Sequence, residues 1–157
     1  MKAGARVLGV AESFSGRHDD DAKSVLAGAL VRPDRAVEDF AFGTCSVGGT
    51  DATDAVAALF ARLGREDVRC LLVAGVAPAW FNLIDLGAVA GAVDRPVISV
   101  SCEDSEGLEP AIREQFDGSA REWRLATYRA LPPRRPVVLG TDDEGRDHRV
   151  FVRAVGV

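Results

Sequence analysis

The sequence predicts an α/β fold in which one mixed sheet carries helices on both faces. Residues 5–47 contain three apolar segments typical of strands, and residues 51–116 alternate helical periodicity with short apolar runs. A strand, a helix and a second strand in succession imply parallel pairing with a right-handed crossover. A chain of 157 residues can bury a sizeable core without disulfides or structural zinc, so we expect a single domain over residues 1–157.

Three antiparallel strands open the predicted order. They are the segments ARVLGVAESF (5–14), SVLAGALVR (24–32) and VEDFAFGTCSV (37–47), with an acidic break at 17–23. Pro33 and Asp34 provide a turn between the second and the third segment, which indicates a hairpin.

An amphipathic helix is predicted next, over residues 51–63. Asp51 is a good N-cap, and Gly64 ends the helix. Between them the apolar residues recur at helical spacing: Val56, Leu59, Phe60 and Leu63.

Buried strands and helices then alternate. The next strands are expected at 69–77 and 96–101, separated by a helix that Asn82 caps. Because helices on both faces would cover the central strands, we expect their apolar residues to be buried: Val7, Leu8, Val10, Leu71, Leu72, Val73, Val97, Ile98 and Val100.

Two helices and a hairpin complete the order. The helices are expected at 108–116 and around 121–128, and the hairpin strands at 136–141 and 148–157. Three antiparallel strands, a helix, a parallel strand, a helix and another parallel strand are the element order of the ribonuclease H-like fold.

Charge and composition limit the functions that the chain can have. With 19 basic and 24 acidic residues the net charge is −5, so any contact with nucleic acid must be local. Apolar stretches are shorter than the ~20 residues of a membrane span, and the chain starts directly in a strand pattern. We therefore expect a cytoplasmic protein without a membrane partner.

The cysteines and histidines do not predict a zinc site. Cys45, Cys70 and Cys102 lack CxxC spacing, and His18 and His148 are isolated.

Several phrases resemble an archaeal family known as domain of unknown function number ninety-nine, whose fold is similar to that of endonuclease V. They are RVLGVAESF, FGTCSVGGTDATDAV, LLVAGVAPAWFNLIDL and PVISVSCEDSEGLEPAI, and the resemblance is strongest between residues 42 and 112. It implies a ribonuclease H-like fold and, in an active member, carboxylates that hold Mg²⁺ or Mn²⁺ for endonuclease chemistry.

Two positions depart from that pattern. Related archaeal sequences tend to have an Asp pair in the first strand and Asp-Gly in the fourth, where this chain has Ala11-Glu12 and Ala74-Gly75. The resemblance therefore favours a domain without metal-dependent nuclease activity. No cofactor is certain; Mg²⁺ or Mn²⁺ is expected if the domain is catalytic.

The remaining carboxylates each have two interpretations. Glu12 is either a displaced metal ligand or a carboxylate at the rim of a loop, and Asp51 is either a ligand or a helix cap. Glu103 and Asp104 follow a strand at the sheet edge where ligands bind, or are solvated acids. An active enzyme would use Glu12, Asp51 and Glu103 in catalysis, and Glu12, Asp51 and Asp104 as metal ligands.

Two segments are candidates for nucleic-acid contact. In the first, Trp80 and Phe81 either stack on bases or form a hydrophobic staple with Asn82 as the cap. In the second, residues 121–135 interleave arginines with Trp123 and Tyr128, and either bind phosphate through Arg134 and Arg135 or form a solvated face.

Three functional hypotheses follow from these residues. The first is an endonuclease V-related domain that binds nucleic acid through a local patch and does not cleave it. The second is an active metal-dependent endonuclease with a rearranged carboxylate set. The third is a homodimeric interaction scaffold that uses a sheet edge or the Trp80–Phe81 surface.

Overall fold

The computed structural model describes residues 4–14, 16 and 22–157. His18 and most of the predicted acidic break therefore lie outside the described residues. The elements of the described chain are, in order, β1 (Arg6–Glu12), β2 (Lys23–Val31), β3 (Val37–Ser46), α1 (Ala52–Leu63), β4 (Val68–Ala74), α2 (Pro78–Phe81), α3 (Leu86–Val93), β5 (Val97–Ser101), α4 (Glu109–Gln115), α5 (Gly118–Arg129), β6 (Arg135–Thr141) and β7 (Asp147–Val155).

The described strands form one seven-stranded mixed sheet in the order β3-β2-β1-β4-β5-β7-β6. β1, β2 and β3 are antiparallel neighbours, and β1, β4 and β5 are parallel neighbours. The predicted α/β fold with three antiparallel and then two parallel strands is confirmed. The terminal hairpin of β6 and β7 is confirmed as well, and it joins the sheet through β5.

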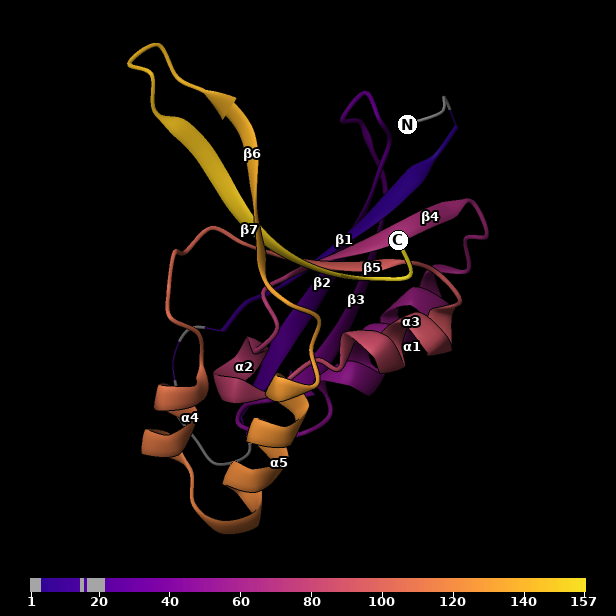
Figure 1. Ribbon diagram of the computed structural model, residues 1–157. Helices are drawn as coiled ribbons and strands as arrows, with labels where there is room; N and C mark the ends of the chain where they lie inside the picture. The colour runs from indigo at the N-terminus through magenta and orange to yellow at the C-terminus, as the bar shows by residue number, and fades with distance from the viewer. Residues whose placement is uncertain (1–3, 15, 17–21) are drawn as a thin grey trace.

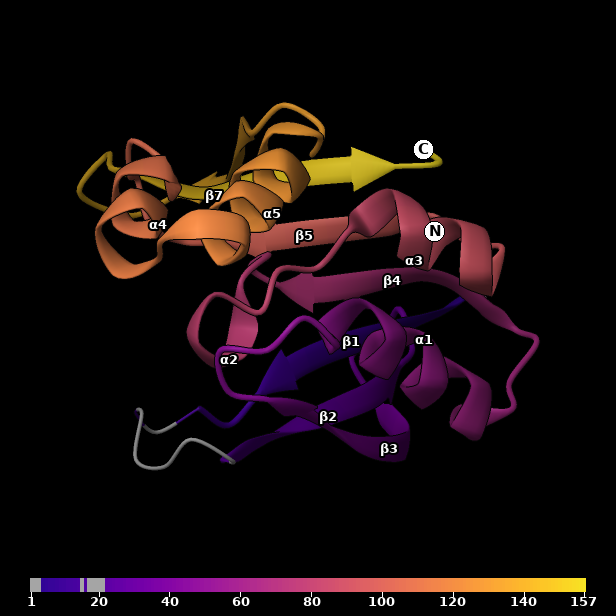
Figure 2. The ribbon, with the colours of Figure 1, turned by 90° about the horizontal axis from the view of Figure 1, so that it is seen from below.

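The helices of the described chain all lie on one face of the sheet, below it in Figure 1 and in front of it in Figure 2. The expectation of helices on both faces is therefore wrong. Leu8, Leu71 and Val97 lie under the helices and are 0% exposed. Residues that alternate with them point to the other face and are only half-buried, against expectation: Val7, Leu72, Ile98 and Val100.

The uncovered side of the sheet, here called the open face, is also apolar. Phe40 and Phe42 on β3 are 59% and 58% exposed, and their rings stack with centroids 6.4 Å apart. Their ladder partners are the apolar residues Ala29 and Ala27 of β2. The sequence was misleading here because both faces of the strands carry apolar residues, so the pattern does not reveal which face is covered.

None of the described helices combines the length and the apolar character needed to cross a membrane.

Helix α1 packs on β2 and β3 and against α3. Leu59 is 0% exposed, so Leu59→Ala is expected to lower the free energy of unfolding by about 2–5 kcal/mol by leaving a cavity. Leu139→Ala is the matched control, because Leu139 is 69% exposed on β6 and should change stability by less than about 0.5 kcal/mol. Urea unfolding of both variants measures the difference; equal stabilities would contradict the packing of α1.

Candidate functional site

The carboxyl ends of β1, β4 and β5 lie at the same end of the sheet, because these strands are parallel neighbours. In Figure 2 the arrowheads of β1 and β4 point to the same side. Open α/β sheets usually bind ligands at such an end. Of the predicted site residues, Glu12 is the last residue of β1 and Glu103 follows the end of β5. The structure therefore brings their backbones to the same edge of the sheet.

Glu12 is held inside the rim of this edge by two hydrogen bonds. Its Oε2 accepts from the backbone N–H of Phe14 at 2.7 Å and from the hydroxyl of Ser24 at 2.5 Å. Glu12 pairs with Leu26, which is buried under the helices, whereas Ala11 pairs with Ala27 on the open face. Because side chains alternate along a strand, Glu12 points to the opposite face from Ala11.

Ala74 ends β4 one residue after Val73, which pairs with Val10 of β1. Ala74 therefore lies beside Ala11, and both are exposed. These two alanines face the same side of the sheet, where a carboxylate from each strand would meet the other. Glu12 cannot supply that carboxylate without turning through the sheet.

Asp51 is a structural residue in this geometry. Its Oδ1 accepts from the Ser46 N–H at 2.9 Å and from the Asn82 amide at 2.7 Å, and its Oδ2 accepts from the Ser46 hydroxyl at 2.9 Å. Burial acts to raise the pKa of Asp51, but these hydrogen bonds outweigh burial and lower the pKa below its ordinary value. They use both oxygens and fix the loop between β3 and α1.

The helix caps differ from those predicted. Asp51 makes no side-chain cap bond to α1; instead the Ala52 N–H at the start of α1 donates to Oδ1 of Asn82 at 2.9 Å. Asn82 does not cap α3, because Asp85 accepts from the Ala88 N–H there. Asn82 was also expected to contact nucleic acid, but it is 0% exposed, so that expectation is wrong.

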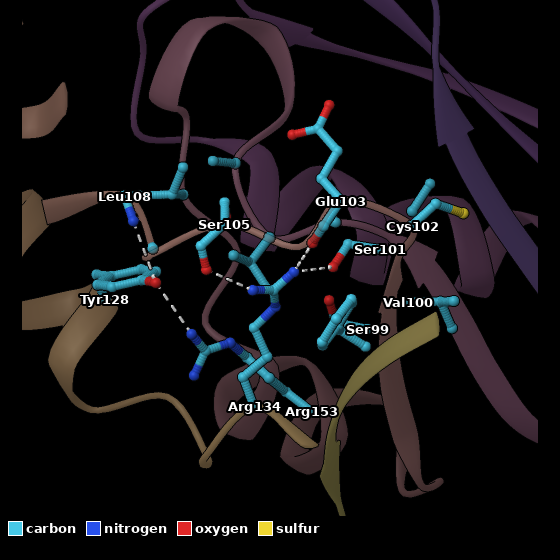
Figure 3. Close-up of a pocket in the computed structure, with 16 residues that line it drawn as sticks. Ser99, Val100, Ser101, Cys102, Glu103, Ser105, Leu108, Tyr128, Arg134 and Arg153 are labelled. Carbon is cyan, nitrogen blue, oxygen red and sulfur yellow. Dashed lines mark hydrogen bonds between the residues drawn. The ribbon is translucent and has the colours of Figure 1, made fainter. Parts of the chain in front are cut away.

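The described carboxylates do not gather into a metal site. Among the residues described, no three His, Cys, Asp or Glu side chains are placed to hold a metal ion together. Glu103 and Asp104 are exposed in the loop after β5, and the Glu103 carboxylate points away from its neighbours in Figure 3. Burial, together with the charges of Asp51 and Glu12, raises the pKa of Cys45 to about 11, so this thiol stays protonated. The residues described do not fit the carboxylate set of a divalent cation.

A left-handed turn stands beside Glu12 at the same end of the sheet. Ala79, Trp80 and Phe81 in α2 have φ values of 47°, 59° and 57°. Residues other than glycine pay ~1–2 kcal/mol each for this conformation. Backbone strain of this kind persists only where surrounding contacts enforce it, and it is concentrated at functional sites.

Arg124 of α5 supplies those contacts, although it is 2% exposed. Its Nε donates to the Phe81 carbonyl at 3.0 Å, and its Nη2 donates to the Gly48 carbonyl at 2.7 Å. The guanidinium lies 3.9 Å from the centre of the Phe116 ring, and burial lowers its pKa. Arg124 thus ties the left-handed turn to the loop between β3 and α1.

Trp80 projects from this turn into an aromatic cluster. Its ring meets Phe81 edge-on with centroids 5.4 Å apart and lies 6.5 Å from the ring of Phe14. Phe81 in turn packs against Phe116, with centroids 5.6 Å apart. Trp80 and Phe14 are half-buried, so part of each ring faces solvent at the end of β1.

The arginines of residues 121–135 do not form one patch. Arg124 is interior, Arg129 pairs with Glu109 at 2.9 Å, and Arg135 is exposed on β6. Arg134 lines a cavity on the other side of β4, together with Arg153 of β7. The sequence placed Arg124 in a phosphate patch or a solvated helix face, which its burial corrects. It gave no role to Arg153, for which an arginine within the apolar run FVRAV was the signal.

Comparison with known proteins identifies the relatives of this chain. Residues 3–157 match the family described as Endonuclease dU. A UPF0215 protein of Pyrobaculum aerophilum is 32% identical over 151 residues, which are 96% of this chain and 75% of the relative. A UPF0215 protein of Pyrobaculum calidifontis is 37% identical over 75% of this chain and 62% of its own length.

Solved structures share the fold. A protein of unknown function from Archaeoglobus fulgidus has a TM-score of 0.76 at 22% identity, covering 98% of this chain and 79% of that one. Endonuclease V of Ciona intestinalis, solved with DNA containing an inosine, has a TM-score of 0.51 at 11% identity, covering 96% and 70% of the two chains. The fold is thus that of the endonuclease V group.

Proposed function

This chain belongs to the endonuclease dU family. We propose that it is an endonuclease V-related domain that binds nucleic acid and does not cleave it by a metal-dependent reaction. The family description makes DNA containing deoxyuridine the first ligand to test. Inosine-containing DNA, the ligand of the Ciona endonuclease V structure, is the second.

The observation that carries this proposal is the alanine at the end of β4. The recess between β1 and β4 lies under the helices, among Val10, Leu26 and Val73, and Ala11 and Ala74 border it where the two strands end. Among the described residues that line it, Glu12 is the only carboxylate. The oxygen ligands of a divalent cation must come from several groups at once. One carboxylate, already bonded to Ser24 and to the Phe14 N–H, does not provide them.

Trp80 supports the binding part of the proposal. A turn that costs conformational energy presents this ring at the sheet end where ligands of α/β folds bind. Bases of a single strand stack on aromatic rings with little dependence on sequence. The net charge of −5 excludes a binding mode that relies on a general basic field.

Replacing Trp80 tests the proposal. Trp80→Ala is expected to weaken binding of a fluorescent single-stranded oligonucleotide containing one deoxyuridine by about 5- to 150-fold, because it removes one stacking contact. Fluorescence anisotropy at low salt measures the affinity. Phe42→Ala is the matched control, since it removes an exposed aromatic ring from the open face and should leave the affinity unchanged.

The wild type is expected to leave the same oligonucleotide uncleaved in Mg²⁺ or Mn²⁺. Failure of the wild type to bind either DNA at low salt would reject the binding role. A homodimer through a sheet edge or the Trp80–Phe81 surface stays a prediction.

A further inference from the structure

A second site lies on the far side of β4 from the Glu12 recess. It is a cavity of about 480 Å³ between the ends of β4 and β5, the strand β7 and the helix α5, here called the hairpin cavity. This volume lies within the range of ligand pockets. Figure 3 shows Ser99, Ser101, Tyr128, Arg134 and Arg153 around it.

Ser99 supplies a hydroxyl to the wall of the hairpin cavity. The residue is 4% exposed, and it lines the cavity from the middle of β5. Its hydroxyl makes no hydrogen bond with any described residue, and no dashed line reaches it in Figure 3. The hydroxyl therefore has no protein partner at the cavity wall and is available to a polar atom of a ligand.

Two arginines also line the hairpin cavity. Arg153 donates from Nη1 to the Pro132 carbonyl at 2.5 Å and from Nη2 to the Tyr128 hydroxyl at 3.0 Å. These bonds hold the guanidinium at the cavity wall without a carboxylate among the described residues.

Arg134 also lies at the cavity wall and donates to backbone carbonyls. It donates to the backbone carbonyls of Ser105 and Glu103, and its guanidinium lies 4.1 Å from the centre of the Phe151 ring. The Glu103 carboxylate points away from it in Figure 3. Two guanidinium groups that have no carboxylate partner among the described residues lie at one cavity of an acidic chain. They favour an anion, and guanidinium groups bind phosphate well.

The remaining walls suit a planar group. Val76, Leu108 and the ring of Phe151 are apolar, and Tyr128 is fixed by the Leu108 N–H, which donates to its hydroxyl at 3.2 Å. A cavity with apolar and aromatic walls, cationic groups and hydroxyls matches a ligand that has a flat ring and a phosphate.

We propose that the hairpin cavity binds one nucleotide, with its base against the apolar wall and its phosphate near Arg134 and Arg153. The Ser99 hydroxyl then bonds to a polar atom of the ligand. The nucleotide is either free or one residue of a bound strand, and the second case rests on the proposed function above.

Calorimetric titration with deoxyuridine monophosphate tests the cavity directly. The wild type is expected to bind one nucleotide per chain. Ser99→Val, which replaces the hydroxyl by a methyl group, and Arg153→Gln, which removes the positive charge, are each expected to weaken binding at least about tenfold. Arg149→Gln is the matched control on β7, because Arg149 is exposed and pairs with Asp147, and it should stay within about twofold of wild type.

Thiol labelling gives a readout that does not depend on the variants. Cys102 lines the cavity and is exposed, whereas Cys70 is half-buried elsewhere on the sheet. The nucleotide is expected to slow alkylation of Cys102 and to leave Cys70 unchanged.

Competition distinguishes the two sources of the nucleotide. If the deoxyuridine oligonucleotide displaces the mononucleotide, the cavity takes a residue of a strand; if both bind together, it takes a free nucleotide. Two results would overturn the inference: no binding of the mononucleotide by the wild type, or binding by Ser99→Val and Arg153→Gln that is as tight as that of the wild type. If the cavity binds no nucleotide but the oligonucleotide still binds and Trp80→Ala weakens that binding, the proposed function stands. If the nucleotide binds but the oligonucleotide does not, only the proposed function is rejected.

Discussion

Ala11→Asp combined with Ala74→Asp is expected to give the protein an affinity for Mn²⁺ at least about tenfold above that of the wild type. The two alanines lie side by side on one face of the sheet, at the ends of β1 and β4. Two carboxylates there would converge on one hard cation. The single change Ala74→Asp adds only one of them and is expected to raise the affinity for Mn²⁺ less. Calorimetric titration with Mn²⁺ measures the effect.

The charge-free pair Ala11→Asn and Ala74→Asn is the matched control, because it adds the same bulk without the carboxylates. Recovery of cleavage is a more demanding outcome than metal binding, since substrate and supporting contacts must also be in place. Metal-dependent cleavage by the wild type, abolished by Glu12→Gln, would overturn the inactive interpretation. It would favour the rearranged set of Glu12, Asp51, Glu103 and Asp104 instead.

Arg124→Met is expected to lower the free energy of unfolding by about 3–5 kcal/mol, since each buried carbonyl that loses its partner costs about 1–3 kcal/mol. Methionine is similar in length, so the main loss is the set of hydrogen bonds to the carbonyls of Phe81 and Gly48. These carbonyls then remain unpaired in the interior, and the left-handed turn loses the contact that opposes its strain. Thermal unfolding measures the change, expected at about 10 °C or more for a chain of this size.

Arg129→Met is the matched control on the same helix. Arg129 is exposed and pairs with Glu109, so its loss should cost less than about 1 kcal/mol. Equal stabilities of the two variants would show that the turn is held without Arg124. In that case the strained backbone at Trp80 would need another explanation.

The local pattern of the sequence was enough to predict most elements. The spacing of Val56, Leu59 and Leu63, with Gly64 in a left-handed conformation at the end, produced the helix that it predicted. The order of strands and helices then left few topologies, because crossovers between parallel strands are right-handed. The mixed sheet and the terminal hairpin follow from these local rules.

The candidate site depended on contacts that no local pattern contains. Periodicity records which residues of one element share a face, but both faces of these strands are apolar, so the covered face was decided by where the helices pack. Arg124 looked like part of a solvated helix face, yet it bonds to the carbonyl of Gly48, 76 residues away in the chain.

The same limit applies to the individual site residues. Asn82 was expected to cap the helix that follows it, and it caps α1 instead because the turn at 79–81 brings its amide to Ala52. Ser99, Arg134 and Arg153 come from three separate segments and meet only when β7 joins β5. The sequence by itself determined the elements and the absence of a carboxylate at residues 11 and 74, because these depend on residue type and spacing. Only the tertiary structure decided the strained turn and the hairpin cavity, because their energies come from contacts between distant segments.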